Sequence, residues 1–91
     1  MPDVRASVQT GPRTHELRSF PRPRIGDDDA LMRVEACGVC GSDVEQFEGG
    51  GRVGPAIPGH EPLGIIDEIG ETASRRWGVR AGDRVAVESY L

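Results

Sequence analysis

Short runs of alternating apolar and polar side chains, separated by Gly and Pro, make up most of this chain. Residues 4–9 alternate cleanly and predict a half-buried strand, and residues 15–20 predict a weaker strand that the prolines at 21 and 23 close. Further strands are predicted at 30–37, 64–69 and 83–88. Helices need longer uninterrupted windows, so the pattern favours a β-rich fold.

One short helix is predicted, over residues 42–47. Ser42 and Glu45 have the spacing of a capping box, in which each side chain satisfies a backbone N–H of the first turn. The glycines at 49–51 end the helix. Residues 75–81 contain Trp77 and are predicted to form a polar connection between strands. The fold class predicted from the pattern is therefore mainly β with one short helix.

Charge and composition exclude some classes of protein. All eleven basic residues are Arg, the net charge is −4, and Arg75–Arg76 is the longest basic run, so no nucleic-acid-binding footprint is visible. No segment approaches the roughly 20 apolar residues of a membrane span, and no leader pattern is present. A cytoplasmic location is expected. The acidic triplet at 27–29 predicts a solvated turn, with a metal or partner site as the alternative.

The two cysteines, Cys37 and Cys40, form a Cys-x-x-Cys pair. In a reducing compartment they are expected to be thiols or metal ligands rather than a disulfide. The pair alone fits a redox site, part of a zinc site, or two small core residues. A closed four-ligand zinc site would need a second Cys or His pair, whereas the two histidines, His15 and His60, lie far apart in the sequence.

A second candidate group surrounds His60, although a single histidine in a loop often has no special role. Cys40, His60 and Glu61 supply a thiolate, an imidazole and a carboxylate, which are plausible ligands for Zn²⁺. Catalytic zinc sites use three protein ligands and leave one position open. Asp43 is predicted to accept a hydrogen bond from the other ring nitrogen of His60, or to favour the helix start as an acidic residue; both roles are compatible.

Three segments in order resemble zinc-dependent medium-chain alcohol dehydrogenases. Gly-His-Glu-Pro-Leu-Gly at 59–64, followed by Gly70 and Ala73, is similar to the family's zinc-site signature. Cys-Gly-Val-Cys-Gly-Ser-Asp at 37–43 resembles the segment upstream of that signature, and Gly-Asp-Arg-Val at 82–85 resembles the segment that follows. With the opening strand, the resemblance covers nearly the whole chain.

The resemblance implies roles for individual residues. Cys40 and His60 are the implied zinc ligands, and Glu61 is either a third ligand or an exchanging group beside the metal. Cys37 is implied to be a small packed residue. Ser42 is similar to the hydroxyl residue that takes the proton from the alcohol. Glu45 stands where many members carry a His, so it is implied as a possible further relay.

The resemblance also implies the architecture and the activity. Residues 1–91 are expected to be a truncated N-terminal part of a GroES-like catalytic domain, a partial β-barrel lacking the Rossmann domain. The whole enzyme would use zinc and NAD or NADP to oxidise a small alcohol or polyol, and it could be a homo-oligomer. These residues alone are expected to be inactive. The alternative is a free-standing GroES-like module that binds zinc or a partner without catalysis.

Overall fold

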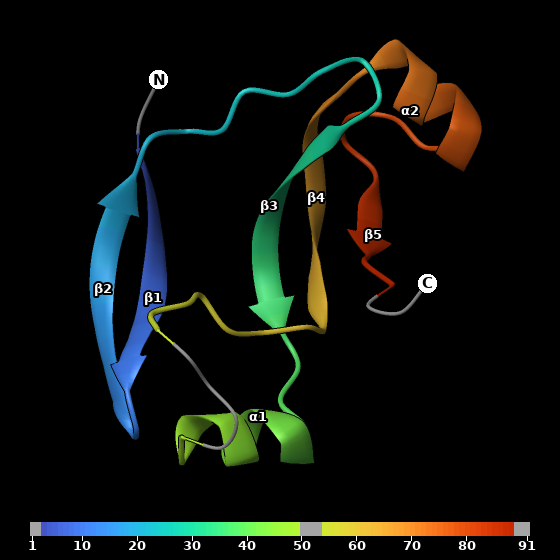
Figure 1. Ribbon diagram of the computed structural model, residues 1–91. Coiled ribbons are helices and arrows are strands. Elements are labelled where there is room, and N and C mark those ends of the chain that lie inside the picture. Colours follow the sequence, from blue (N-terminus) through green and yellow to red (C-terminus); the bar gives the residue numbers. More distant parts are fainter. Residues whose placement is uncertain (1–2, 50–53, 89–91) are drawn as a thin grey trace. The chain divides into compact units, whose positions relative to one another are not determined.

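Strands predominate in the computed structural model, which describes residues 3–49 and 54–88 (Figure 1). The chain divides into two compact units. Unit 1 comprises Met1–Arg22 and Gly38–Gly59, and unit 2 comprises Pro23–Cys37 and His60–Leu91. The mainly β prediction is confirmed, and the described residues contain two short helices rather than the single one predicted.

Unit 1 is built on a β-hairpin and a short helix. Strand β1 (Val4–Gly11) pairs antiparallel with β2 (Thr14–Phe20), and helix α1 spans Gly41–Phe47, so all three predicted elements are confirmed. Gly49 follows α1 with a positive φ of 100°, a conformation that favours glycine. The predicted glycine stop is therefore confirmed at its first position, and its other two glycines lie outside the described residues.

Gln9 departs from the strand pattern. Alternation predicts a solvent-facing side chain there, yet Gln9 is fully buried next to the buried Val8. Its backbone forms an isolated antiparallel bridge with Ala56, with N–O distances of 2.9 and 3.2 Å. The segment before His60 is thus anchored on the side of β1 that β2 does not occupy.

Unit 2 contains a three-stranded antiparallel sheet in the order β3-β4-β5. The strands are β3 (Ala30–Cys37), β4 (Pro62–Ile69) and β5 (Arg84–Ala86). All three strand predictions are confirmed, although β5 is shorter than the predicted 83–88. Ile66 on the central strand is buried and forms the apolar centre of this sheet.

Helix α2 (Glu71–Trp77) was missed by the sequence prediction, which assigned residues 75–81 to a polar connection between strands. Its first turn is capped by a distant residue. Asp27 accepts hydrogen bonds from the Glu71 backbone N–H at 3.0 Å and from the Thr72 hydroxyl, and its backbone carbonyl accepts one from Ala73 N–H at 3.1 Å. The helix ends at Gly78 in the left-handed conformation.

The acidic triplet forms a turn, as predicted, and all three carboxylates have protein partners. Besides Asp27, Asp28 lies 2.7 Å from the Arg76 guanidinium, and Asp29 accepts a hydrogen bond from the Gly26 N–H at 3.1 Å. These contacts give the acidic residues structural roles within unit 2.

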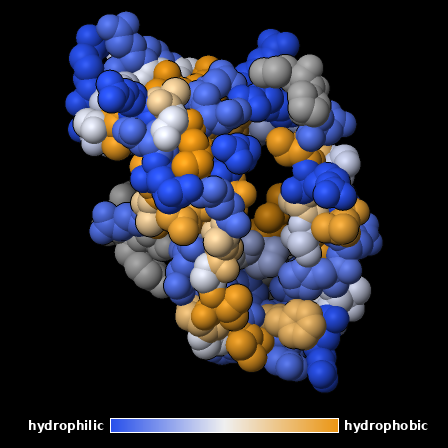
Figure 2. All heavy atoms as spheres, turned by 180° about the vertical axis from the view of Figure 1, so that it is seen from behind, coloured by the Kyte–Doolittle hydropathy of each residue, from blue (hydrophilic) through white to orange (hydrophobic). Residues whose placement is uncertain are grey.

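Few apolar side chains are buried in the described residues. Val8, Ile66 and Ala73 are the buried apolar residues, while several larger ones are exposed, including Leu17 at 71% and Val39 at 78%. Figure 2 shows apolar residues open on the surface among polar ones. Neither described helix is long and apolar enough to cross a membrane.

Candidate metal-binding site

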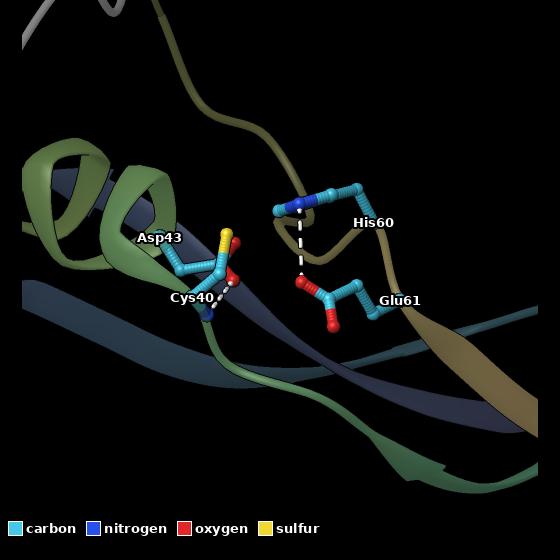
Figure 3. A group of neighbouring side chains, drawn as sticks. All are labelled: Cys40, Asp43, His60 and Glu61. Carbon is cyan, nitrogen blue, oxygen red and sulfur yellow. Dashed lines mark hydrogen bonds and ion pairs between the residues drawn. The ribbon is translucent and has the colours of Figure 1, made fainter. Parts of the chain in front are cut away.

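Cys40 marks the start of helix α1. Its backbone is extended, with φ −126° and ψ 179°, so it is the N-cap and Gly41 is the first helical residue. The Asp43 carboxylate turns back and accepts the Cys40 backbone N–H at 2.9 Å (Figure 3). This bond fixes the backbone from which the Cys40 sulfur projects.

The predicted capping box of Ser42 and Glu45 is therefore wrong. Ser42 is the second helical residue, and the residue that reaches back from the third position is Asp43. The sequence reasoning missed this arrangement because cysteine is not among the residues that favour the N-cap. Asp43 has the predicted role of an acid at the helix start, and it acts through a specific hydrogen bond.

Ser42 lies beside the candidate ligand sulfur. Its Oγ is 3.0 Å from Cys40 Sγ, and either atom could be the donor. If the cysteine is a thiolate, which has no proton to donate, the hydroxyl must donate. The Ser42 oxygen is then held next to whatever Cys40 binds.

Glu45 is exposed on the same helix, three residues after Ser42. Residues at this spacing lie on neighbouring positions of one helix face. The two side chains predicted to relay protons therefore share a face of α1, and both residues are exposed.

His60 and Glu61 form the other group of candidate ligands, directly before β4. His60 Nε2 lies 3.4 Å from Glu61 Oε2, and the side chains are 30% and 46% exposed (Figure 3). Such a pair forms an ion pair when the imidazole is protonated. The same two atoms could instead face a shared cation.

The chemistry and spacing of these groups fit zinc. Thiolate, imidazole and carboxylate are the protein ligands of Zn²⁺. Two ligands held at about 2.0–2.1 Å in a tetrahedral site are about 3.3–3.4 Å apart. The 3.4 Å separation between His60 Nε2 and Glu61 Oε2 has this value.

The predicted site residues fall into two groups. Cys40, Ser42 and Asp43 lie together in unit 1, and His60 and Glu61 lie together in unit 2. The prediction for Cys37 was wrong, because this cysteine is exposed at the end of β3 rather than packed.

Shifted pKa values occur at structural contacts within unit 2. The Thr72 hydroxyl, followed by the other contacts of the α2 cap, lowers the pKa of the Asp27 carboxyl. The hydrogen bond from Arg84 lowers the pKa of Glu35, and the same contact raises the pKa of Arg84. The Glu35–Arg84 pair joins β3 to β5 and Asp27 caps α2, so these pKa shifts reflect contacts that stabilise the fold.

Comparison with known proteins supports the resemblance. The family described as the alcohol dehydrogenase GroES-like domain matches residues 26–90. A probable alcohol dehydrogenase of Mycobacterium tuberculosis is 58% identical over 88 residues, covering 96% of this chain and 24% of that protein. The erythritol/L-threitol dehydrogenase of Mycolicibacterium smegmatis is 38% identical, covering 97% of this chain and 27% of that protein.

A solved structure shows the same fold. The apo form of zinc-dependent alcohol dehydrogenase 2 from Streptococcus pneumonia matches with a TM-score of 0.72 and 27% identity, over 91% of this chain and 24% of that one. This chain spans about a quarter of the length of the proteins it matches. Because the family match extends over most of its residues, the chain belongs to the family of alcohol dehydrogenase GroES-like domains.

Proposed function

We propose that these residues carry part of the catalytic zinc site of a dehydrogenase that oxidises a small alcohol or polyol with NAD or NADP. The observation that carries the proposal is the donor set. A cysteine is fixed at the start of α1, and a His–Glu pair before β4 has its nitrogen and oxygen 3.4 Å apart. In the proposed site Cys40 and His60 bind the ion, with Glu61 as a third or exchanging ligand.

Chain connectivity supports a shared ion. Cys37 and Pro62 are paired at the end of the β3–β4 ladder. Cys40 follows Cys37 by three residues, and His60 precedes Pro62 by two. Since each residue spans at most about 3.6 Å, both ligands are tethered close to the same end of this sheet.

The residues around the proposed ligands have distinct tasks. Bound zinc would supply a Lewis acid for the alcohol oxygen. Ser42 Oγ accepts the proton of the substrate hydroxyl while its own hydroxyl proton leaves towards the Glu45 carboxylate, which is on the same helix face and exchanges protons with solvent. Asp43 holds the Cys40 backbone and accepts a hydrogen bond from the His60 ring. A carboxylate has about four acceptor positions, so the two bonds are compatible.

The hydride acceptor and the substrate are proposed from the relatives. A relative named for erythritol and L-threitol supports a polyol or other small alcohol. NAD or NADP would bind to a Rossmann domain, for which the sequence at 1–91 shows no Gly-rich phosphate loop. Residues 1–91 are therefore proposed to be an N-terminal part of the catalytic domain and to be inactive by themselves. A cytoplasmic location, assembly as a homo-oligomer and no nucleic-acid or membrane partner stay predictions.

The zinc content of single-residue variants tests the ligands. Cys40→Ala and His60→Ala each remove one proposed ligand, so we expect each variant to bind less zinc than the wild-type chain in equilibrium dialysis at the same free zinc concentration. Isolated residues 1–91 should bind zinc only weakly, because two firm ligands are fewer than the usual three. Zinc per folded chain is measured by atomic emission spectroscopy alongside circular dichroism.

The chain offers a matched control for each change. Cys37→Ala removes the other cysteine, which is exposed, and His15→Ala removes the other histidine. Both controls should keep the zinc stoichiometry of the wild type. Equal zinc in the wild type and in either ligand variant would contradict the proposed site.

A further inference from the structure

Gln9 is a buried polar residue that joins three segments of unit 1. Its side chain is fully buried, and Nε2 donates to three backbone carbonyls, those of Gly11 at 3.1 Å, Gln46 at 2.9 Å and Phe47 at 3.2 Å. Its own backbone is hydrogen-bonded to Ala56. One residue of β1 thus holds the end of helix α1 and the segment that leads to His60.

These contacts are not needed to satisfy the helix carbonyls. The Gln46 carbonyl also accepts the Gly49 N–H at 3.0 Å, and the Phe47 carbonyl accepts the Arg13 N–H at 2.6 Å. Each therefore has a backbone donor without Gln9.

The glutamine also carries a cost. Among residues 3–49 and 54–88, its buried Oε1 has no hydrogen-bond partner. An unsatisfied buried acceptor opposes folding, and a buried apolar residue of similar size would avoid this penalty. Stability alone does not account for a glutamine at this position, whereas a role in fixing the position of α1 does.

We infer that Gln9 is a positioning residue for the proposed zinc site. Helix α1 is only seven residues long; Cys40 and Asp43 fix its first turn, and Gln9 fixes its last. Ala56, which Gln9 also holds, lies four residues before His60. Gln9 therefore limits the movement of the two segments that carry the ligands. This inference rests on the proposed function and adds a residue far from the ligands in sequence.

Two substitutions that nearly preserve the size of the side chain test whether Gln9 positions helix α1 or only fills space. Gln9→Met keeps an unbranched side chain but removes the donor and the orphaned acceptor together. Gln9→Glu keeps the shape but, when ionised, presents only acceptors to three carbonyl oxygens. Val8→Ala is the control, because Val8 is the buried neighbour on β1 and its side chain points to the opposite face.

The first measurement is amide hydrogen exchange of the full chain without metal. The amides of Arg13 and Gly49 bond to the last helix carbonyls. In Gln9→Met we expect these amides to exchange about tenfold faster than in the wild type, after correction for the change in global stability. Gln9→Glu should show a larger effect. Val8→Ala should change these amides only in proportion to its global stability. Unchanged relative exchange in both Gln9 variants would overturn the inference.

The second measurement is the visible and near-ultraviolet spectrum of the cobalt(II)-loaded full chain, which reports the thiolate and the geometry around the ion. We expect both Gln9 variants to shift the cobalt bands and to weaken cobalt binding about tenfold or more. Mutating groups that orient metal ligands typically lowers metal affinity by about 10- to 100-fold. Val8→Ala, compared at equal folded fraction, should leave the bands in place. Wild-type bands and affinity in Gln9→Met would overturn the inference, as would equal shifts in Val8→Ala.

The two measurements also separate this inference from the zinc proposal. A wild-type cobalt spectrum that does not change in Cys40→Ala would refute the zinc site and, with it, the role of Gln9 at the metal. The exchange rates would then still decide whether Gln9 holds α1. A Cys40-dependent spectrum that is insensitive to Gln9 would refute only the positioning role.

Discussion

Among single residues, Gly64 shows that the segment resembling a zinc-site signature also contains a residue required for packing. A Cβ placed on Gly64 would lie 2.1 Å from the Arg33 carbonyl oxygen and 3.0 Å from Met32 Cγ. Both neighbours belong to β3, whose pairing with β4 contains an irregularity directly after Val34, the residue paired with Gly64. Glycine is needed there because the two backbones approach closely.

Gly64→Ala should therefore destabilise the sheet without removing a ligand. The added methyl group meets backbone rather than a flexible side chain, so we expect a loss of about 1–3 kcal/mol in the free energy of unfolding, as for other overpacked sites. Urea denaturation measures this loss. Gly11→Ala, where the same methyl group would meet no atom within 4 Å, is the control. A Gly64→Ala variant as stable as this control would contradict the argument.

At the scale of elements, helix α2 depends on a cap supplied from outside the helix. Hydrogen bonds to the Asp27 carboxylate lower its pKa below the ordinary 3.8, so the folded state favours the ionised form. A group with a depressed folded-state pKa stabilises the protein above its ordinary pKa, and this stabilisation is lost as the pH falls through the lowered value.

Asp27→Ala should accordingly lower the melting temperature at neutral pH. The gap between wild type and variant should close as the pH falls below about 3.8, because protonated Asp27 no longer caps the helix as a carboxylate. Thermal denaturation between pH 7 and pH 2 measures the gap. Asp28→Ala removes only an exposed ion pair with Arg76 and should have a smaller effect. A gap that does not depend on pH would count against the cap.

The same cap explains which elements the sequence could predict. The strands and α1 follow local alternation and glycine boundaries, so each could be found from its own residues. Helix α2 begins at Glu71, and its N-cap, Gly70, has no side chain to cap it. The capping residue, Asp27, lies more than forty positions earlier. Local patterns cannot show such a contact. The burial of Gln9 was missed for the same reason, since its partners on α1 are distant in sequence.

For the molecule as a whole, the order of the motifs predicted more of the candidate site than any single motif did. Cys37-x-x-Cys40 alone left redox, zinc and packing roles open. The later segment with His60 and Glu61 led to the zinc interpretation, and the matching family supports it. Spacing alone could not show that Cys40 is the N-cap or that Cys37 is exposed, because both depend on where β3 ends and α1 begins.

Isolated residues 1–91 should self-associate and lack dehydrogenase activity. Leu17 is 71% exposed on β2, which pairs only with β1 among the described residues, so an apolar side chain lies on an open strand edge. We expect light scattering to show concentration-dependent association, which Leu17→Lys reduces and Arg18→Lys does not. In a separate assay, we expect no alcohol-dependent reduction of NAD or NADP. The two readouts have separate meanings: a monodisperse, cooperatively folded chain would favour the free-standing module, whereas cofactor reduction would show that the site functions without a dinucleotide-binding domain.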